Sequence, residues 1–134
     1  MKRLLFIILA LSLLFVSCEN ARQKEAFAAR EGVCLEVGGT TVFSRSWDNC
    51  QYAFNRDRRT FRAQDDDMTD YFSVQFKNLP LYVGEEIKAS VKWTEYRGMG
   101  QKINVTLQVL RIEGDKVWLR EPNGQIALTV RVLE

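Results

Sequence analysis

The sequence of 134 residues contains no histidine, and this absence removes whole classes of chemistry. Histidine is the side chain that titrates near neutral pH, acts as the base of Ser-His-Asp triads and is a frequent ligand of zinc. The motif S-x-x-K, which would let a lysine activate a serine, is missing as well. The sequence therefore predicts a protein that is not an enzyme and that holds no metal and no cofactor.

An excess of either charge is also lacking. The chain has 19 basic residues against 17 acidic ones, and two of the basic residues, Lys2 and Arg3, lie in a segment that we expect to be removed. The mature chain would then be neutral, with 17 of each. Binding to a nucleic acid needs a sustained excess of Lys and Arg on one face, so we expect no nucleic-acid partner.

Long hydrophobic runs are confined to the beginning of the chain. The two positive charges of Lys2 and Arg3 precede a nearly unbroken apolar run from Leu4 to Val16. This run is shorter than the roughly 20 residues that cross a bilayer as a helix, so residues 1–17 are predicted to be a signal peptide. The four residues "FVSC" resemble the lipobox of bacterial lipoproteins, which implies diacylation of Cys18 and anchoring in a membrane. Ordinary secretion with an unmodified Cys18 is the alternative.

Residues 18–32 differ in composition from what precedes and follows them. They are charged and rich in alanine, and they lack a full apolar stripe. These features indicate a lipidated tether, in part helical, that ends at Gly32. The domain proper is expected to comprise residues 33–134.

Cysteine is scarce, with three residues in the chain. Cys18 is assigned to lipidation, which leaves Cys34 and Cys50 as a pair. Export to an oxidising compartment favours a disulfide between them, and closing this loop would stabilise the domain by about 3 kcal/mol. Two buried thiols or a redox-active pair are the alternatives, although the spacing is far from C-x-x-C.

From residue 33 onward, apolar and polar side chains alternate with a period of two, as in strands that bury one face. Segments rich in Gly, Pro and Asn separate these stretches, as turns require. We therefore expect an all-β domain, a small antiparallel meander forming a barrel or sandwich of about 7–9 strands. The clearest inner faces are Phe72-Val74-Phe76, Ile87-Ala89-Val91-Trp93, Ile103-Val105-Leu107-Val109 and Ile126-Leu128-Val130-Val132.

Two tryptophans are candidate binding residues. A two-residue turn at Asn123-Gly124 would pair Leu119 with Leu128 and direct Trp118 outward, whereas a three-residue turn that includes the preceding proline would bury Trp118. Both turns are common, so both registers stay open. Trp47, which precedes Cys50, is interpreted as a plug beside the expected disulfide, with an exposed binding role as the alternative.

The stretch "RRTFRAQDDDMTDYFSVQF" places Asp65, Asp67 and Asp70 close together, and such oxygen ligands suit calcium. The central glycine and the downstream bidentate glutamate of an EF-hand are both missing. We therefore expect a solvated turn, with Asp67 or Thr69 capping a helical turn between two strands. Neighbouring arginines, residues 56, 58, 59 and 62, are available to neutralise the aspartates.

The same stretch carries a resemblance. "FRAQDDDMTDYFSVQF", "YVGEEIKASVKW" and the closing "DKVWL…VRVL" hairpin resemble small lipoproteins of Bacteroidetes with a compact β domain of unknown function. The resemblance spans residues 47–134 and implies a host-associated bacterial source and a β fold, without an activity or site residues. Surface lipoproteins of that group commonly carry an acidic cluster after the cysteine, whereas here Arg22 and Lys24 follow Glu19. We therefore expect an outer-membrane lipoprotein of the cell envelope that faces the periplasm.

Two functions fit these expectations. The first is a lipid-anchored, non-catalytic binding module for an envelope protein or glycan, since small β scaffolds present variable loops. The second is an inhibitor or immunity-type lipoprotein, which would insert either the segment "TEYRGMGQK" or the loop 65–70 into a protease or toxin. A carrier of apolar ligands would need an empty barrel, and the bulky inner faces predict a filled one.

Overall fold

The computed structural model describes residues 22–65, 69–95 and 99–132. The chain divides into two units, residues 1–30 and residues 31–134. In the first unit, residues 22–28 form a helix. Within the described part of the chain, no helix is both long and apolar enough to cross a membrane. The predicted signal peptide and Cys18 lie outside the described residues.

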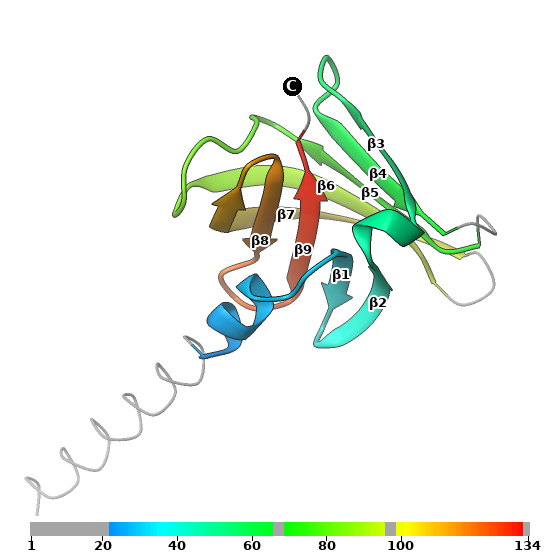
Figure 1. The fold of residues 1–134 in the computed structure, drawn as a ribbon, viewed down its shortest axis with the longest axis horizontal. Coiled ribbons are helices and arrows are strands. Elements are labelled where there is room, and N and C mark those ends of the chain that lie inside the picture. The colour runs from blue at the N-terminus through cyan, green and yellow to red at the C-terminus, as the bar shows by residue number, and fades with distance from the viewer. Residues whose placement is uncertain (1–21, 66–68, 96–98, 133–134) are drawn as a thin grey trace, which may run out of the picture. The chain divides into compact units, whose positions relative to one another are not determined.

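The second unit contains one antiparallel sheet of nine strands in the order β2-β1-β9-β8-β7-β6-β5-β4-β3 (Figure 1). The all-β prediction is confirmed, and the sheet curls into a half-barrel. Strands β3 to β9 form the expected meander, and the N-terminal hairpin β1–β2 is added beside β9. The strands are β1 (Val33–Val37), β2 (Thr40–Arg45), β3 (Gln51–Asn55), β4 (Thr60–Gln64), β5 (Tyr71–Phe76), β6 (Glu86–Glu95), β7 (Met99–Glu113), β8 (Lys116–Arg120) and β9 (Ile126–Arg131).

Strands β2 and β3 lie at opposite ends of the sheet although they are neighbours in the chain. A short 3-10 helix, η1 (Trp47–Asn49), connects them. The curl of the sheet allows this connection, because it brings β2 opposite β5: the rings of Phe43 and Phe72 meet edge to face with centroids 5.4 Å apart.

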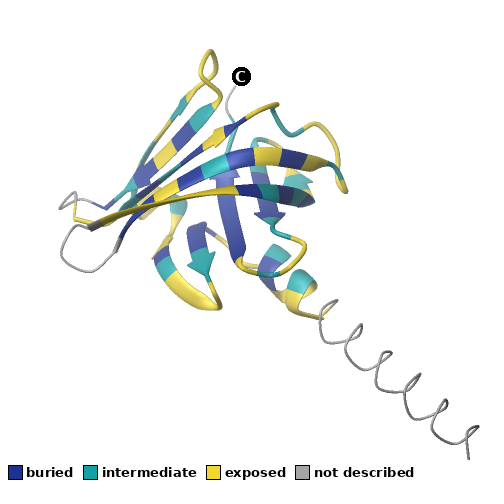
Figure 2. Cartoon of the chain, turned by 180° about the vertical axis from the view of Figure 1, so that it is seen from behind, coloured by how far each residue is buried: buried dark blue, intermediate teal, exposed yellow. Residues whose placement is uncertain are grey.

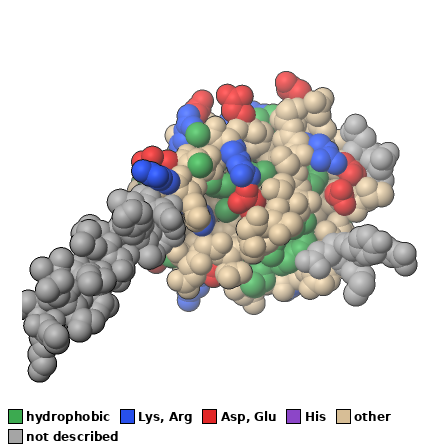
Figure 3. All heavy atoms as spheres, turned by 90° about the horizontal axis from the view of Figure 1, so that it is seen from below, with side chains coloured by type: hydrophobic (Ala, Val, Ile, Leu, Met, Phe, Trp, Pro, Cys, Tyr) green, Lys and Arg blue, Asp and Glu red, His purple; other side chains and the backbone are tan. Residues whose placement is uncertain are grey.

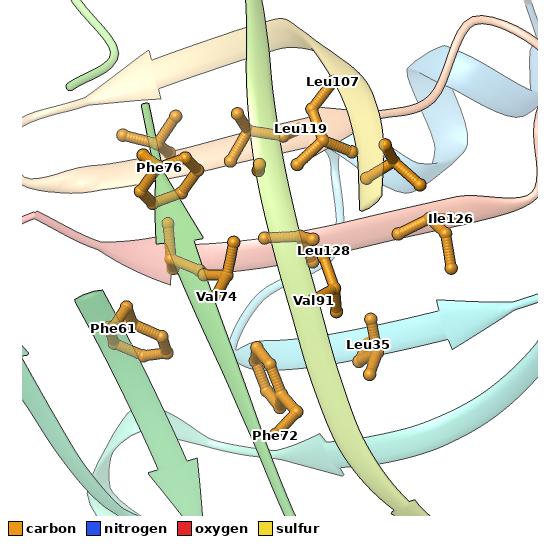
Figure 4. Close-up of a cluster of buried hydrophobic side chains, with 14 of the residues drawn as sticks. Leu35, Phe61, Phe72, Val74, Phe76, Val91, Leu107, Leu119, Ile126 and Leu128 are labelled. Carbon is orange, nitrogen blue, oxygen red and sulfur yellow. The ribbon is translucent and has the colours of Figure 1, made fainter. Parts of the chain in front are cut away.

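The inner face of the curled sheet holds the hydrophobic core. Burial alternates along β3 to β7 as the period of two predicts, whereas successive residues of β1, β8 and β9 are buried (Figure 2). Buried side chains from eight strands gather in the enclosed space and fill it, which does not suit a carrier with an empty barrel (Figure 4). The labelled members are Leu35, Phe61, Phe72, Val74, Phe76, Val91, Leu107, Leu119, Ile126 and Leu128.

Ile103 departs from its predicted place in the core. Val105, Leu107 and Val109 on the same face are buried, but 37% of Ile103 is exposed. The reason lies in the sheet, because β8 pairs with β7 only from Gln108 to Glu113. The N-terminal half of β7 therefore has a neighbouring strand on one side only.

The predicted disulfide is wrong, since Cys34 and Cys50 are not joined. Cys34 lies between the two core residues Val33 and Leu35, so its side chain points to the opposite face of the sheet, where Sγ is 3.6 Å from Thr129 Oγ1. Cys50 instead packs against the core cluster. The two thiols thus lie on opposite faces, and a disulfide cannot bridge a sheet in this way.

The turn after β8 settles the register at Trp118. Leu119 pairs with Leu128, which is the register of the two-residue Asn123-Gly124 turn and places Trp118 on the face opposite the core. This residue is nevertheless only 3% exposed. The inference that an outward Trp118 would be available for binding is therefore wrong.

Candidate functional site

The aspartate loop, residues 65–70, is a turn held in place by hydrogen bonds. It connects the end of β4 at Gln64 with the start of β5 at Tyr71, and Asp65 N–H donates to the Asp70 carbonyl over 3.0 Å. Asp65 is the capping residue, in place of Asp67 or Thr69: its carboxylate accepts hydrogen bonds from the backbone N–H and the hydroxyl of Thr69, each at 3.0 Å. Thr94 of β6 donates to the Thr69 carbonyl over 3.2 Å, which ties the turn to the sheet.

The Asp65 carboxylate is buried, in contrast to the solvated turn that we expected. Burial opposes the ionisation of Asp65. The hydrogen bonds that its carboxylate accepts from Thr69 and from the backbone of Asp70, together with the charge of Arg45, outweigh this effect and hold the pKa of Asp65 below its ordinary value. The cation beside Asp65 is Arg45 of β2, whose Nη2 lies 3.8 Å from Asp65 Oδ2. It is not one of the four arginines that the sequence suggested.

A calcium site at this loop has little support from the residues that can be placed. Asp65 uses both carboxylate oxygens for Thr69, and Asp70 is exposed. Asp67 lies outside the described residues. Among the residues that are described, no group of three His, Cys, Asp or Glu side chains is arranged to hold a metal ion.

Trp47 belongs to a cluster that links β3, at one end of the curled sheet, to β9. Its ring packs edge to face on Tyr52 of β3 at 5.5 Å, and the Arg131 guanidinium lies 5.7 Å from the Trp47 ring and 5.2 Å from the Tyr52 ring. Arg131 donates to the Tyr52 hydroxyl and, through Nε and Nη2, to Asp115 Oδ2 at 2.9 and 2.5 Å. Trp47 is half-buried and packs against the core, so its contacts are those of a structural residue.

Among the residues that the structure describes, the most exposed large apolar side chains lie on the loop of residues 77–85, between β5 and β6. Leu81, Tyr82 and Val83 are consecutive and are 78%, 62% and 59% exposed. Single exposed apolar residues are common on soluble proteins, but a contiguous group usually marks a contact with another molecule. We call these three residues the apolar tip.

The backbone holds the apolar tip in a defined conformation. Glu85 Oε1 accepts hydrogen bonds from the N–H groups of Leu81 and Tyr82, at 2.8 and 3.4 Å. Gly84, with φ of +93°, donates to the Val109 carbonyl over 2.8 Å, and the Val109 N–H donates to Glu85 over 2.9 Å. The positive φ explains why glycine occupies this position. A loop fixed in this way loses little conformational entropy when it binds.

A polar groove of about 860 Å³ lies beside the same loop, since Lys77 and Glu86 at the two ends of the loop line it. Its floor crosses three strands at the cross-strand neighbours Gln75, Ser90 and Asn104. The turn 121–123 between β8 and β9 forms another wall. This groove is the second candidate interaction surface.

Charge is mixed on the face shown in Figure 3, where acidic and basic side chains lie next to each other. This view contains no extended basic area of the kind that binds nucleic acid or an anionic membrane. Recognition through a single strong charge is therefore not supported on that face.

The alternation of apolar and polar residues did not predict the apolar tip. In the segment "NLPLYVGE", Pro80 and Gly84 indicate a turn, and the segment does connect β5 and β6. The overlooked signal was three consecutive apolar residues inside a turn, where polar residues are the norm. The groove had no signal in the sequence, because it depends on where β8 ends relative to β7.

No family model matches the chain, and no match was found among curated proteins or among solved structures.

Proposed function

We propose that this protein is a lipid-anchored, non-catalytic binding module of the bacterial cell envelope, and that it recognises a protein partner through the apolar tip. The observation that carries the proposal is the exposure of Leu81, Tyr82 and Val83 on a loop held by hydrogen bonds. Burying an exposed Leu or Val side chain stabilises by about 1.5–3 kcal/mol, so three such residues offset much of the cost of association.

A protein partner fits this tip better than a glycan. Sugars are bound by converging polar groups, commonly beside an aromatic ring, whereas the tip presents two aliphatic side chains next to its tyrosine. The three tryptophans of the chain are not exposed for stacking on a sugar, since Trp93 and Trp118 are buried and Trp47 is packed against the core. An apolar cleft on another protein is complementary to the tip.

The test places a photo-reactive residue in the tip. Tyr82 is replaced by p-benzoylphenylalanine in intact cells of the source bacterium, and Asp57 of the exposed β3–β4 turn is replaced in the same way as a matched control. We expect one protein adduct of defined mass from position 82 and none from position 57. The serine variant Leu81→Ser/Val83→Ser should reduce that adduct at least tenfold. A lipid adduct, or the same adduct from both positions, would contradict the proposal.

The anchor is proposed from the sequence, because Cys18 lies outside the described residues. The lipobox resemblance supports diacylation of Cys18, and the residues that follow it support an outer-membrane position facing the periplasm. Cys18→Ala should release the protein from the membrane fraction and abolish incorporation of labelled fatty acid. A membrane-bound, unlabelled variant would contradict the proposed anchor.

An inhibitor or immunity-type lipoprotein is the second candidate, and the stiffness of the loop favours it. Inhibitory loops enter a cleft in a preformed conformation, and Glu85 and Gly84 hold this loop in place. The inserting loop would then be residues 79–85, in place of the two segments expected from the sequence. A position-82 adduct with a protease or toxin whose activity falls with one equivalent of the protein would favour this candidate.

A further inference from the structure

The N-terminal half of β7 is an open edge of the sheet. β7 pairs with β6 from Met99 to Gln108, but with β8 only from Gln108 to Glu113. On the β8 side, none of the strands in the described ranges pairs with residues 100–107. An unpaired strand edge presents backbone donors and acceptors that can pair with another extended chain.

The register identifies which groups this edge presents. The Val109 N–H donates to the Glu85 carbonyl over 2.9 Å, so Val109 directs its backbone groups toward the β6 side. The β6–β7 register continues without a shift, and in an antiparallel pair alternate residues point their N–H and C=O to opposite sides. Lys102, Asn104 and Thr106 therefore direct their N–H and C=O groups to the open edge.

The polar groove lies along this edge. Asn104, Val105 and Thr106 line it from β7, and the turn 121–123 lines it from the other side. Two buried side-chain oxygens of residues that line the groove, Ser90 Oγ and Glu121 Oε2, have no hydrogen-bond partner within the described structure. Buried polar atoms are normally hydrogen-bonded to protein or to ordered water, so these two oxygens are available to a molecule in the groove that donates hydrogen bonds.

The two faces of the edge differ in chemistry. On the inner face, Ile103 is 37% exposed beside the buried Val105, which leaves apolar surface for a further strand to cover. On the outer face, Lys88 and Lys102 make no ion pair with any residue in the described ranges. A strand added here would gain from apolar side chains on one face and acidic side chains on the other.

We propose that the open edge of β7 binds an extended segment of a protein partner, which adds a strand beside residues 100–106 and runs through the groove. Its side chains alternate between apolar and acidic, and a donor group, such as its N-terminal amine, reaches Glu121. This proposal rests on the proposed function, because it takes from it that the partner is a protein. A short segment fits better than a second copy of the chain, because in each copy the turn 121–123 borders the groove that the other β7 would have to enter.

The test selects heptapeptides with free N-termini from a random library on the immobilised full chain. We expect enrichment of sequences that alternate apolar and acidic residues. The selected peptide should bind Asn104→Pro, which lacks the outward N–H, at least tenfold more weakly than the unmodified protein. Asn104→Ala keeps this N–H and is the matched control, with affinity within about threefold. A library without enrichment, or equal binding to the proline and alanine variants, would overturn the proposal.

Hydrogen exchange of the unmodified protein, measured by NMR, keeps the test valid if the proline variant does not fold. The peptide should slow exchange at Lys102, Asn104 and Thr106 at least tenfold and leave Ile103 and Val105 nearly unchanged. Equal slowing at all five amides, or at none, would overturn strand addition. The variant Leu81→Ser/Val83→Ser should still bind the peptide. Failure of the photo-crosslink at position 82 therefore contradicts the apolar tip alone, and failure of peptide binding contradicts the edge alone.

Discussion

Replacing Arg131 should weaken the closure of the curled sheet. Arg131 on β9 reaches Asp115 in the β7–β8 turn, Tyr52 on β3 and Trp47 on η1. Its hydrogen bonds with Asp115 raise the pKa of the guanidinium above its ordinary value although burial opposes this, so the side chain stays charged at every pH at which the protein folds. One side chain thus links β3, at one end of the sheet, to β9, which pairs with β1 and β8.

The expected loss follows from these contacts. Hydrogen bonds between charged partners contribute about 1.5–3 kcal/mol, and solvent screening reduces this to about 1–1.5 kcal/mol here, because the Arg131 and Asp115 side chains are 25% and 30% exposed. Two cation–π contacts add about 0.5–1 kcal/mol each. Arg131→Met, which preserves part of the packing, should lower the free energy of unfolding by about 2 kcal/mol.

Urea unfolding followed by circular dichroism measures this loss, and thermal unfolding should show a fall in Tm of roughly 10 °C for a domain of this size. A double-mutant cycle with Asp115→Asn should give a coupling energy of about 1 kcal/mol. A coupling energy near zero would show that the ion pair contributes nothing and would refute the reasoning.

Arg111 is the matched control. It also forms an ion pair, with Glu113 at 2.5 Å, and lies 4.9 Å from the ring of Trp118. Its side chain and that of Glu113 are 45% and 58% exposed, however, and exposed pairs contribute little. Arg111→Met should therefore cost about 0.5 kcal/mol. An equal loss from both variants would contradict a special role for Arg131.

Three further predictions concern the sheet and its turns. Because the pKa of Asp65 is lowered in the folded state, its ionised form stabilises the fold above the unfolded-state pKa, and this contribution is lost as pH falls through the folded-state pKa. The difference in unfolding free energy between Asp65→Asn and the unmodified protein should therefore shrink from pH 7 to pH 3 in urea titrations, and a constant difference would count against this. Because Cys34 and Cys50 are not joined, dithiothreitol should leave Tm unchanged, whereas a fall would reveal a disulfide. Gly32→Ala should lower the free energy of unfolding by about 1–3 kcal/mol, since φ is +98° and a Cβ would lie 2.5 Å from a backbone oxygen. Gly100→Ala, whose Cβ would meet no atom within 4 Å, should be nearly neutral in the same unfolding assay.

Local pattern predicted the strands well and their placement less well. The inner faces of β5, β6 and β9 followed from alternation, because side chains on a half-buried strand must alternate. Ile103 was misplaced because its burial depends on a neighbouring strand that begins to pair only at Gln108. Alternation along β7 contains no information about the length of β8.

The candidate sites were predicted less well than the strands. Alternation between Val33 and Leu35 already placed Cys34 on the face opposite the core, but the face of Cys50 depends on η1 and could not be inferred. The register at the Asn123-Gly124 turn is one of the two that the sequence allowed. This register did not decide the exposure of Trp118, because a residue on the outer face can still be covered. Burial on that face is set by tertiary structure.

The position of β1 beside β9 has a consequence for the order in which the domain forms. Cys34 pairs with Thr129, so the first strand of the sheet must wait for the last one to become available. Contacts between such distant parts of a chain are costly to form early, and we expect the β3–β9 meander to assemble before the N-terminal hairpin docks. A chain cut short before residue 126 would therefore lose two strand pairings at once, β8–β9 and β1–β9, and would expose two new edges to aggregation.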